Sequence, residues 1–174
     1  MVVREERRGY GSACLKAVGQ VPAADILVFM DGDGSDDPRE IELLLAALTV
    51  QGADLVIGSR VLGQTEEGAL TPVQTFGNSL TCGLVHLLWG VRYTDLGPFR
   101  AVRWETLQAL EMQDRNYGWT VEMQIKAAQR GVAYREVPVS YRQRVGVSKV
   151  SGTLRGSVGA GVKILWLLGR YAWS

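Results

Sequence analysis

The segment ILVFMDGDGSDDPREIE, residues 26–42, leads from an apolar run through a loop with four aspartates into a helical pattern. The apolar run, residues 25–30, is short enough for a buried β-strand. Pro38 is expected to start the following helix, with Asp37 as its N-cap and Glu40 three residues further on, as in a capping box. The segment therefore predicts a strand, an acidic loop and a helix in succession, which is the repeating unit of an α/β fold.

The same alternation continues along the chain. Further strands are expected in ADLVIGSR, GPFRAVR and VAYREVPVSYRQR, and Pro138 restricts part of the last one to a sheet edge or a bulge because proline lacks a backbone N–H. Further helices are expected over residues 9–18, 78–89, 104–112, 119–130 and 153–171. The pattern predicts a single α/β domain over residues 1–174, built as a sandwich with a mainly parallel sheet.

The composition excludes several classes of protein. A net charge of +1 and a hydrophobic content of 47% exclude a disordered chain and a protein that binds nucleic acid through bulk charge. Because His86 is the only histidine, a zinc site of histidines and cysteines is not expected. Cys14 and Cys82 each lie in a helical pattern, and buried free thiols fit a reducing, cytoplasmic compartment.

The charge is distributed unevenly along the chain. From Tyr134 onward there are seven basic residues and one acid, a net charge of +6, so residues 1–133 sum to −5. Such a basic segment is expected to meet an anionic partner. No uninterrupted apolar run approaches the roughly 20 residues that a membrane span requires.

The acidic loop allows three interpretations: a solvated turn, a calcium loop, or a metal site that holds a phosphorylated substrate. Ligands of α/β folds bind at the carboxyl ends of strands, which favours a functional loop over a plain turn. A calcium loop of the EF-hand type requires glycine where Asp36 stands and a preceding helix where a strand is expected. Asp31 and Asp33, one residue apart, could instead converge on Mg²⁺ or Mn²⁺, which would take further oxygens from a substrate diphosphate.

Five blocks of sequence occur in an order that resembles a known family. They are VFMDGDGSDDP, DLVIGSR, TDLGPFRAVRW, YGWTVEMQIKAAQRG and EVPVSYRQRVGVSK. In this order they resemble the inverting family 2 glycosyltransferases, and in particular the branch of dolichyl-phosphate mannose synthases and bacterial polyprenyl-phosphate glycosyltransferases. The resemblance implies a GT-A fold, a Rossmann-like three-layer sandwich. It also implies metal-dependent transfer of a sugar from a nucleotide-sugar to an acceptor, which in that branch is a polyprenyl phosphate at the membrane surface.

The resemblance assigns the anion-binding part of the site. Asp31 and Asp33 fall on the metal-binding Asp-x-Asp motif, and the metal would stabilise the leaving nucleotide diphosphate. Arg60 falls where relatives hold an acceptor phosphate or the sugar donor. The segment that closes over the diphosphate in relatives is matched by Arg144, Ser148 and Lys149. A solvated basic loop is the alternative for that last segment.

The resemblance also assigns two carboxylates near the sugar, Asp95 and Glu122, one of which would be the general base. If the acceptor is a phosphate monoester, it needs little deprotonation, and the carboxylate would orient the sugar instead. Glu122 has an alternative explanation, because an acid in the first turn of a helix is favoured by the helix dipole alone. Arg100 and Arg103 are interpreted as charges on the face of a strand.

The start of the chain departs from the family pattern. The resemblance implies that Met1 falls near the third strand of the family's sheet, so the chain is expected to be an N-terminally truncated, partial domain. A miscalled gene start, a fragment and a chain that has lost donor binding are the alternatives. Missing strands would leave an open sheet edge, which favours a homo-oligomer. A non-catalytic binding module is therefore the alternative function, and a nucleotidyltransferase is a third.

The tail, residues 153–174, is expected to form an amphipathic helix. Its apolar residues and tryptophans, flanked by Arg155, Lys163 and Arg170, are typical of a helix that lies in a membrane interface. A helix packed on the sheet is the alternative, since Gly156, Gly159 and Gly161 allow close packing. The interface interpretation would make the protein peripheral on the inner face of the membrane.

Overall fold

The computed structural model describes residues 2–146 and 154–173, and side chains in the second range from residue 159 onward. Its sheet has four strands in the order β1-β3-β2-β4. Their bounds are β1 (Ile26–Phe29), β2 (Leu55–Ser59), β3 (Arg100–Arg103) and β4 (Tyr134–Pro138). β2 pairs with β4 in parallel, whereas β3 is antiparallel to both β1 and β2. Three strands thus run in one direction, but β3 lies between β1 and β2 and runs against them, so the sheet is mixed and β2 and β4 form its parallel pair.

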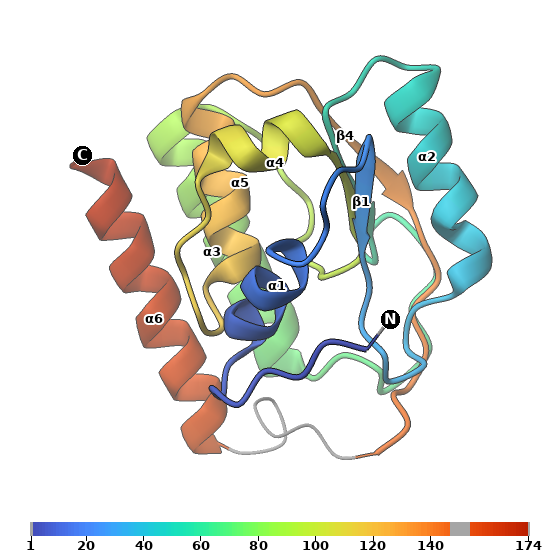
Figure 1. Ribbon diagram of the computed structural model, residues 1–174. Coiled ribbons are helices and arrows are strands. Elements are labelled where there is room, and N and C mark those ends of the chain that lie inside the picture. The colour runs from blue at the N-terminus through green and yellow to red at the C-terminus, as the bar shows by residue number, and fades with distance from the viewer. Residues whose placement is uncertain (1, 147–153, 174) are drawn as a thin grey trace.

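Helices cover both faces of this sheet (Figure 1). Their bounds are α1 (Tyr10–Val18), α2 (Ile41–Thr49), α3 (Pro72–Trp89), α4 (Trp104–Leu110), α5 (Trp119–Gln129) and α6 (Leu154–Ala172). Alternate strand residues face opposite sides: Leu55 and Ile57 join the core beneath α3, α5 and α6, while Val56 joins the core beneath α2. This period of two builds the expected three-layer α/β sandwich.

The helix that follows the acidic loop begins as the sequence predicts. A single 3₁₀ turn, η1 (Pro38–Glu40), precedes α2, and the Asp37 carboxylate caps it by accepting the backbone N–H of Arg39. Glu40 does not close a capping box. Its carboxylate accepts the backbone N–H of Ser140, at 3.0 and 2.9 Å, and so ties this turn to the segment after β4.

Helix α3 is longer than its hydrophobic pattern predicts, because it starts at Pro72 and not at residue 78. Thr71 and Gln74 form a capping box: the Thr71 hydroxyl accepts the Gln74 N–H, and the Gln74 side chain accepts the Thr71 N–H. The helix ends at Gly90, whose φ of 73° is the left-handed conformation that glycine adopts without strain.

Helix α6 packs beside α3 and α5, with Leu167 and Leu168 buried in the same core as Trp119 and Ile57. The sequence of the tail predicts that it either lies in a membrane interface or packs on the sheet. The burial of Leu167 and Leu168 shows that one side of α6 packs on the domain. In the part of the chain that the structure describes, no helix is both long and apolar enough to cross a membrane.

Two leucines of α6 test this packing. Leu168→Ala should lower the free energy of unfolding by about 2–4 kcal/mol, because it opens a cavity under a side chain that is only 3% exposed. Leu165→Ala, at 53% exposure, should cost less than about 0.5 kcal/mol. Urea unfolding measures both variants, and equal losses would show that α6 is not docked through this face.

Candidate functional site

The acidic loop directly after β1 divides its four carboxylates among three roles. Asp33 is held in place because its Oδ1 accepts hydrogen bonds from the Ser35 hydroxyl, at 2.6 Å, and from the Ser35 N–H, at 3.1 Å. Its Oδ2 faces Nη1 of Arg144 at 3.2 Å. Burial alone would raise the pKa of Asp33, but the Ser35 hydrogen bonds and the charge of Arg144 outweigh it and lower the pKa. Asp33 is therefore ionised at neutral pH.

The carboxylate of Asp31 is more buried than that of Asp33, and the negative charge of Asp33 acts on it. Burial raises the pKa of Asp31, and the neighbouring carboxylate of Asp33 raises it further, while Arg144 and Arg60 act in the opposite direction. Two carboxylates that disfavour each other's ionisation are stabilised by a cation between them. The residues present thus fit a divalent metal.

Asp36 supports the loop from beneath. Its Oδ2 accepts the backbone N–H of Asp31 at 3.2 Å, and it is almost fully buried. Within the described residues its Oδ1 has no hydrogen-bond partner. Burial raises the pKa of Asp36 to about 6. Asp37 belongs to a different neighbourhood, since Arg39 and Arg142 pair with it and hold its pKa below the usual range.

The segment after β4 crosses the acidic loop. The Arg142 N–H donates to the Ser35 carbonyl at 2.9 Å, and the Val145 N–H donates to the Asp33 carbonyl at 2.8 Å. These backbone bonds bring Arg144 to Asp33, so the structure unites the two parts that the sequence assigned to a diphosphate. Ser148 and Lys149 lie outside the described residues.

Arg60 and Asp95 form a buried pair at the end of β2. Nε and Nη2 of Arg60 meet the two carboxylate oxygens of Asp95 at 2.8 and 2.7 Å, and the Arg60 N–H donates to the same carboxylate. The guanidinium also lies over the Tyr141 ring, 5.0 Å from its centroid. Burial would lower the pKa of Arg60, but the hydrogen bonds to Asp95 prevail and raise it. Both carboxylate oxygens of Asp95 thus accept hydrogen bonds from Arg60. The role of Asp95 as a base stays a prediction.

The loop that carries Asp95 rests on polar side chains that the sequence patterns did not reveal. Glu136 of β4 accepts the backbone N–H groups of Thr94 and Asp95, and Asn78 of α3 accepts that of Leu96. The Gln124 amide donates to the Asp95 carbonyl at 2.9 Å. Three elements far apart in the sequence therefore fix the position of Asp95.

The interpretation of Arg100 as a strand-face charge is wrong, because the residue is fully buried. Its guanidinium donates to the carbonyls of Thr120, Leu96 and Gly97, which joins the Asp95 loop to α5. Burial lowers the pKa of Arg100 to about 10. Arg103, by contrast, is partly exposed and pairs with Asp54 at 3.3 Å.

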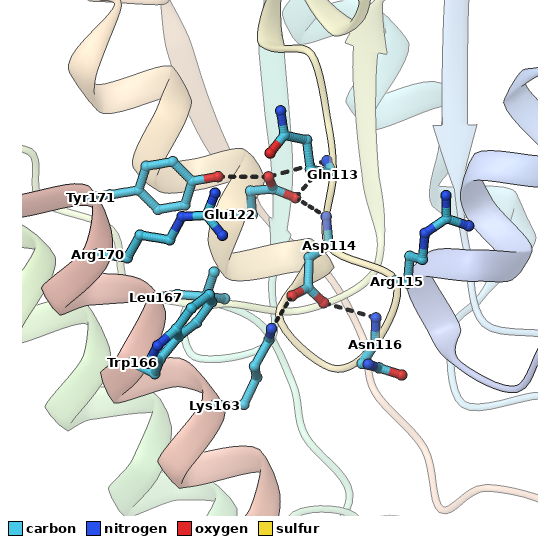
Figure 2. Close-up of a pocket in the computed structure, with 10 residues that line it drawn as sticks. All are labelled: Gln113, Asp114, Arg115, Asn116, Glu122, Lys163, Trp166, Leu167, Arg170 and Tyr171. Atoms are coloured by element: carbon cyan, nitrogen blue, oxygen red, sulfur yellow. Dashed lines mark hydrogen bonds and ion pairs between the residues drawn. The ribbon is translucent and has the colours of Figure 1, made fainter. Parts of the chain in front are cut away.

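Glu122 lies in a separate pocket between α5, α6 and the loop of residues 111–118 (Figure 2). Its carboxylate accepts the backbone N–H groups of Gln113 and Asp114 and the Tyr171 hydroxyl, and it pairs with Lys126 at 2.9 Å. These contacts close the α4–α5 loop against α6. Within the described residues Glu122 makes no hydrogen bond or ion pair with the acidic loop, so its assignment near the sugar stays a prediction.

The structure groups the predicted site residues unequally. It brings Asp31, Asp33 and Arg144 together, with Arg60 close enough to affect the pKa of Asp31. Among residues 2–146 and 154–173, no group of three or more His, Cys, Asp or Glu side chains is arranged to hold a metal. The pair of carboxylates can thus supply only part of a coordination shell, and water and substrate oxygens would have to complete it.

The family model described as "Glycosyl transferase family 2" matches residues 1–130, most of the chain. The chain belongs to glycosyl transferase family 2. Its curated relatives include an uncharacterized glycosyltransferase of Mycobacterium tuberculosis, 37% identical over 164 residues, which covers 90% of this chain and 71% of that relative. An undecaprenyl-phosphate mannosyltransferase of Micrococcus luteus is 33% identical over 163 residues, covering 88% of this chain and 65% of the relative. A polyprenol monophosphomannose synthase of Mycolicibacterium smegmatis is 34% identical over 159 residues, covering 86% and 59%.

Solved structures confirm the GT-A type of fold. A glucosyl-3-phosphoglycerate synthase from Mycobacterium tuberculosis superposes with a TM-score of 0.72 at 21% identity, covering 97% of this chain and 57% of that one. The same synthase in complex with Mn²⁺, uridine-diphosphate-glucose and phosphoglyceric acid gives a TM-score of 0.71, covering 95% and 55%. This family 2 chain thus spans little more than half of those structures.

The raised pKa of Asp36 predicts a dependence of stability on pH. The folded-state pKa of about 6 exceeds the ordinary value of 3.8, so the stability contributed by the protonated form is full below pH 3.8 and is lost as the pH rises through 6. Asp36→Asn keeps an acceptor for the Asp31 N–H and removes this loss. Relative to the parent, the variant should gain about 1–3 kcal/mol between pH 4 and pH 8. Chemical unfolding at both pH values measures the difference, and an equal offset at the two would contradict a raised pKa.

Proposed function

We propose that this chain binds the diphosphate of a nucleotide-sugar through Mg²⁺ or Mn²⁺ and takes part in transferring the sugar, with inversion, to a polyprenyl phosphate. The observation that carries the proposal is the Asp31–Asp33 pair at the end of β1, with Arg144 held against it. The names of two relatives support the acceptor, because the one from Micrococcus luteus is an undecaprenyl-phosphate mannosyltransferase and the one from Mycolicibacterium smegmatis is a polyprenol monophosphomannose synthase. The Mn²⁺ and nucleotide-sugar complex of the solved synthase supports the donor and the metal.

The acidic loop and Arg144 divide the work of holding the diphosphate. Asp31 and Asp33 would hold the metal, which supplies positive charge to the departing diphosphate. Arg144 pairs with Asp33, and if Asp33 held a cation this guanidinium would be available to a phosphate oxygen, for which it is well shaped. Ser148 and Lys149 would add donors from the same segment. The ion pair between Arg144 and the acidic loop would thus be replaced by a pair between Arg144 and the substrate.

The acceptor side requires little proton transfer. A phosphate monoester already carries the negative oxygen that attacks the sugar carbon, and attack from the face opposite the diphosphate inverts that carbon. Asp95 is held by Arg60, so we assign the pair an orienting role: Asp95 fixes the guanidinium, and Arg60 binds the acceptor phosphate or the sugar. Glu122 keeps the α4–α5 loop closed, and general-base catalysis by Glu122 is not needed for this acceptor.

A binding module without transfer activity is the second candidate. It is favoured by the position of β1, which is an edge strand of the described sheet although it carries the acidic loop. A groove of about 510 Å³ runs along β1 and α1, lined by residues such as Leu27, Phe29 and Val18. A chain of this kind would bind nucleotide but form no product.

The proposed setting is the cytoplasmic face of a membrane, because a polyprenyl chain resides in the bilayer while nucleotide-sugars are soluble. A peripheral association of this chain would bring its acidic loop to the acceptor phosphate. Self-association into a homo-oligomer is a separate expectation from the open edge of β1.

Two arginines of the segment after β4, Arg142 and Arg144, allow a matched test. Arg144→Gln should weaken the binding of a nucleoside diphosphate in the presence of Mn²⁺ about tenfold or more, since hydrogen bonds to charged groups contribute roughly 1.5–3 kcal/mol. It should leave the binding of the nucleoside nearly unchanged. Arg142→Gln is the control, because Arg142 pairs with Asp37 outside the proposed metal site. Calorimetry with a panel of nucleoside diphosphates measures both.

Equal losses for the two variants, or equal losses for nucleoside and nucleoside diphosphate, would contradict the diphosphate clamp. Transfer is followed separately, by incubating each bound nucleotide-sugar, labelled in the sugar, with a polyprenyl phosphate and extracting the lipid. Label in the lipid fraction supports the transferase. Donor binding without labelled lipid supports the binding module.

A further inference from the structure

Helix α6 is apolar on the side that faces away from the core. Leu167 and Leu168 are buried, whereas Val162, Leu165, Trp166 and Trp173 are exposed on the opposite side. Within the described side chains of residues 159–173, Gly159 and Gly169 lie among these residues on the outward side, and Lys163 and Arg170 flank Trp166 at the border of the stripe. A helix that only covers a soluble domain normally presents charged residues there.

Helix α3 repeats this pattern. Cys82 and Val85 are buried, while Val73, Phe76, Leu80 and Leu87 form an exposed stripe at helical spacing that is interrupted only by Gly83. Phe76 is 69% exposed and Leu87 78% exposed, so neither is covered by a neighbouring element. Two helices with the same exposed apolar stripe are not explained by chance exposure of single residues.

The two stripes belong to one side of the molecule. α3 and α6 pack against each other, and both bury their inner sides in the core beneath the same face of the sheet (Figure 1). Their outer sides therefore look away from that common core. We call the exposed residues of both helices, Val73, Phe76, Leu80, Leu87, Val162, Leu165, Trp166 and Trp173, the α3–α6 face.

The charges of these helices are of one sign. Neither Pro72–Trp89 nor Leu154–Ala172 contains an aspartate or glutamate, while α6 carries Arg155 and, among the residues whose side chains the structure describes, Lys163 and Arg170. Both cations lie over the Trp166 ring, at 4.4 and 5.2 Å from its centroid. Lys163 also pairs with Asp114 beneath it, which leaves Arg170 as the less neutralised of the two. Tryptophan with basic residues beside an apolar surface is the composition of helices at a membrane interface.

From these observations we infer that the α3–α6 face docks on a lipid bilayer that contains anionic headgroups. A second copy of the chain fits this face less well, because a symmetric contact would bring the cations of two copies together with no acid from either helix to pair with them. The bilayer instead buries the apolar stripes and offers negative charge to Lys163 and Arg170.

The inner side of α3, opposite the exposed stripe, contacts the candidate site. Asn78 of α3 holds the loop of Asp95 through the Leu96 N–H and the Thr94 carbonyl, at 2.9 Å each. A bilayer on the outer side of α3 would thus be separated from the loop of Asp95 by the width of this helix. This placement rests on the proposed function, since it gives a lipid-borne phosphate a short path to Arg60, whereas the docking itself does not depend on it.

Vesicle co-sedimentation of the whole chain, without nucleotide or metal, tests the docking. The chain should sediment with vesicles of phosphatidylcholine and phosphatidylglycerol, more weakly with pure phosphatidylcholine, and less at high salt. Leu87→Gln on α3 and Leu165→Gln on α6 should each lower the partition coefficient about tenfold. Leu43→Gln is the matched control, because Leu43 is similarly exposed, at 48%, but lies on α2 across the sheet. Thermal melting verifies that the three exposed replacements leave the fold intact.

Absence of vesicle binding by the parent chain, or an equal loss in Leu43→Gln, would overturn the inference. A dimer seen by light scattering that both α3 and α6 variants dissociate, with no vesicle binding, would assign the face to a second copy. Asp33→Ala should bind vesicles as the parent does, and Leu165→Gln should still bind a nucleoside diphosphate. Failure of the docking and failure of the proposed glycosyl transfer are thereby measured separately.

Discussion

Electrostatic repulsion among the carboxylates of one short loop is the constraint on which the rest of the site depends. Asp31, Asp33, Asp36 and Asp37 lie within seven residues, and a loop so charged needs hydrogen bonds and cations to keep one conformation. The chain supplies them separately: Ser35 and Arg144 to Asp33, Arg39 and Arg142 to Asp37. Among the residues that the structure describes, Asp36 pairs with no such cation, and its burial raises its pKa. Asp31 still experiences the repulsion of the Asp33 carboxylate, which also raises its pKa. The repulsion that remains is what a divalent cation would relieve.

The surrounding fold explains why the guanidinium groups of Arg144 and Arg60 lie close to the acidic loop. β4 runs parallel to β2, so the chain leaves both strands at the same edge of the sheet, where β1 also ends. The segment after β4 then crosses the acidic loop, held by the Glu40–Ser140 contact and by backbone bonds to Ser35 and Asp33. Arg60 leaves β2 at this edge and is fixed by Asp95. Sheet topology therefore places two guanidinium groups around the acidic loop before any ligand binds.

The sequence predicted those features that local chemistry determines. The strands follow from apolar runs such as residues 25–30, and the cap of η1 follows from Asp37 before Pro38. The reversed direction of β3 could not be predicted, because the period-two pattern is the same in both directions. The burial of Arg100 depends on carbonyls of Gly97 and Thr120, and the Arg60–Asp95 pair joins residues 35 positions apart. Such contacts depend on tertiary packing, and residue type alone does not predict them. The Thr71–Gln74 capping box, by contrast, is local, because threonine followed three residues later by glutamine is the sequence signature of this cap.

The metal assignment is tested most directly by following the backbone amide NMR signals of the chain during a titration with substoichiometric Mn²⁺. Paramagnetic broadening falls off steeply with distance, so it reports which residues surround the ion. If the Asp31–Asp33 pair is the metal site, the amides of Asp31, Asp33 and Ser35 should broaden first, and Asp33→Ala should abolish this effect. Broadening that starts instead at Gln113 and Asp114, beside Glu122, or that persists unchanged in Asp33→Ala, would contradict the account.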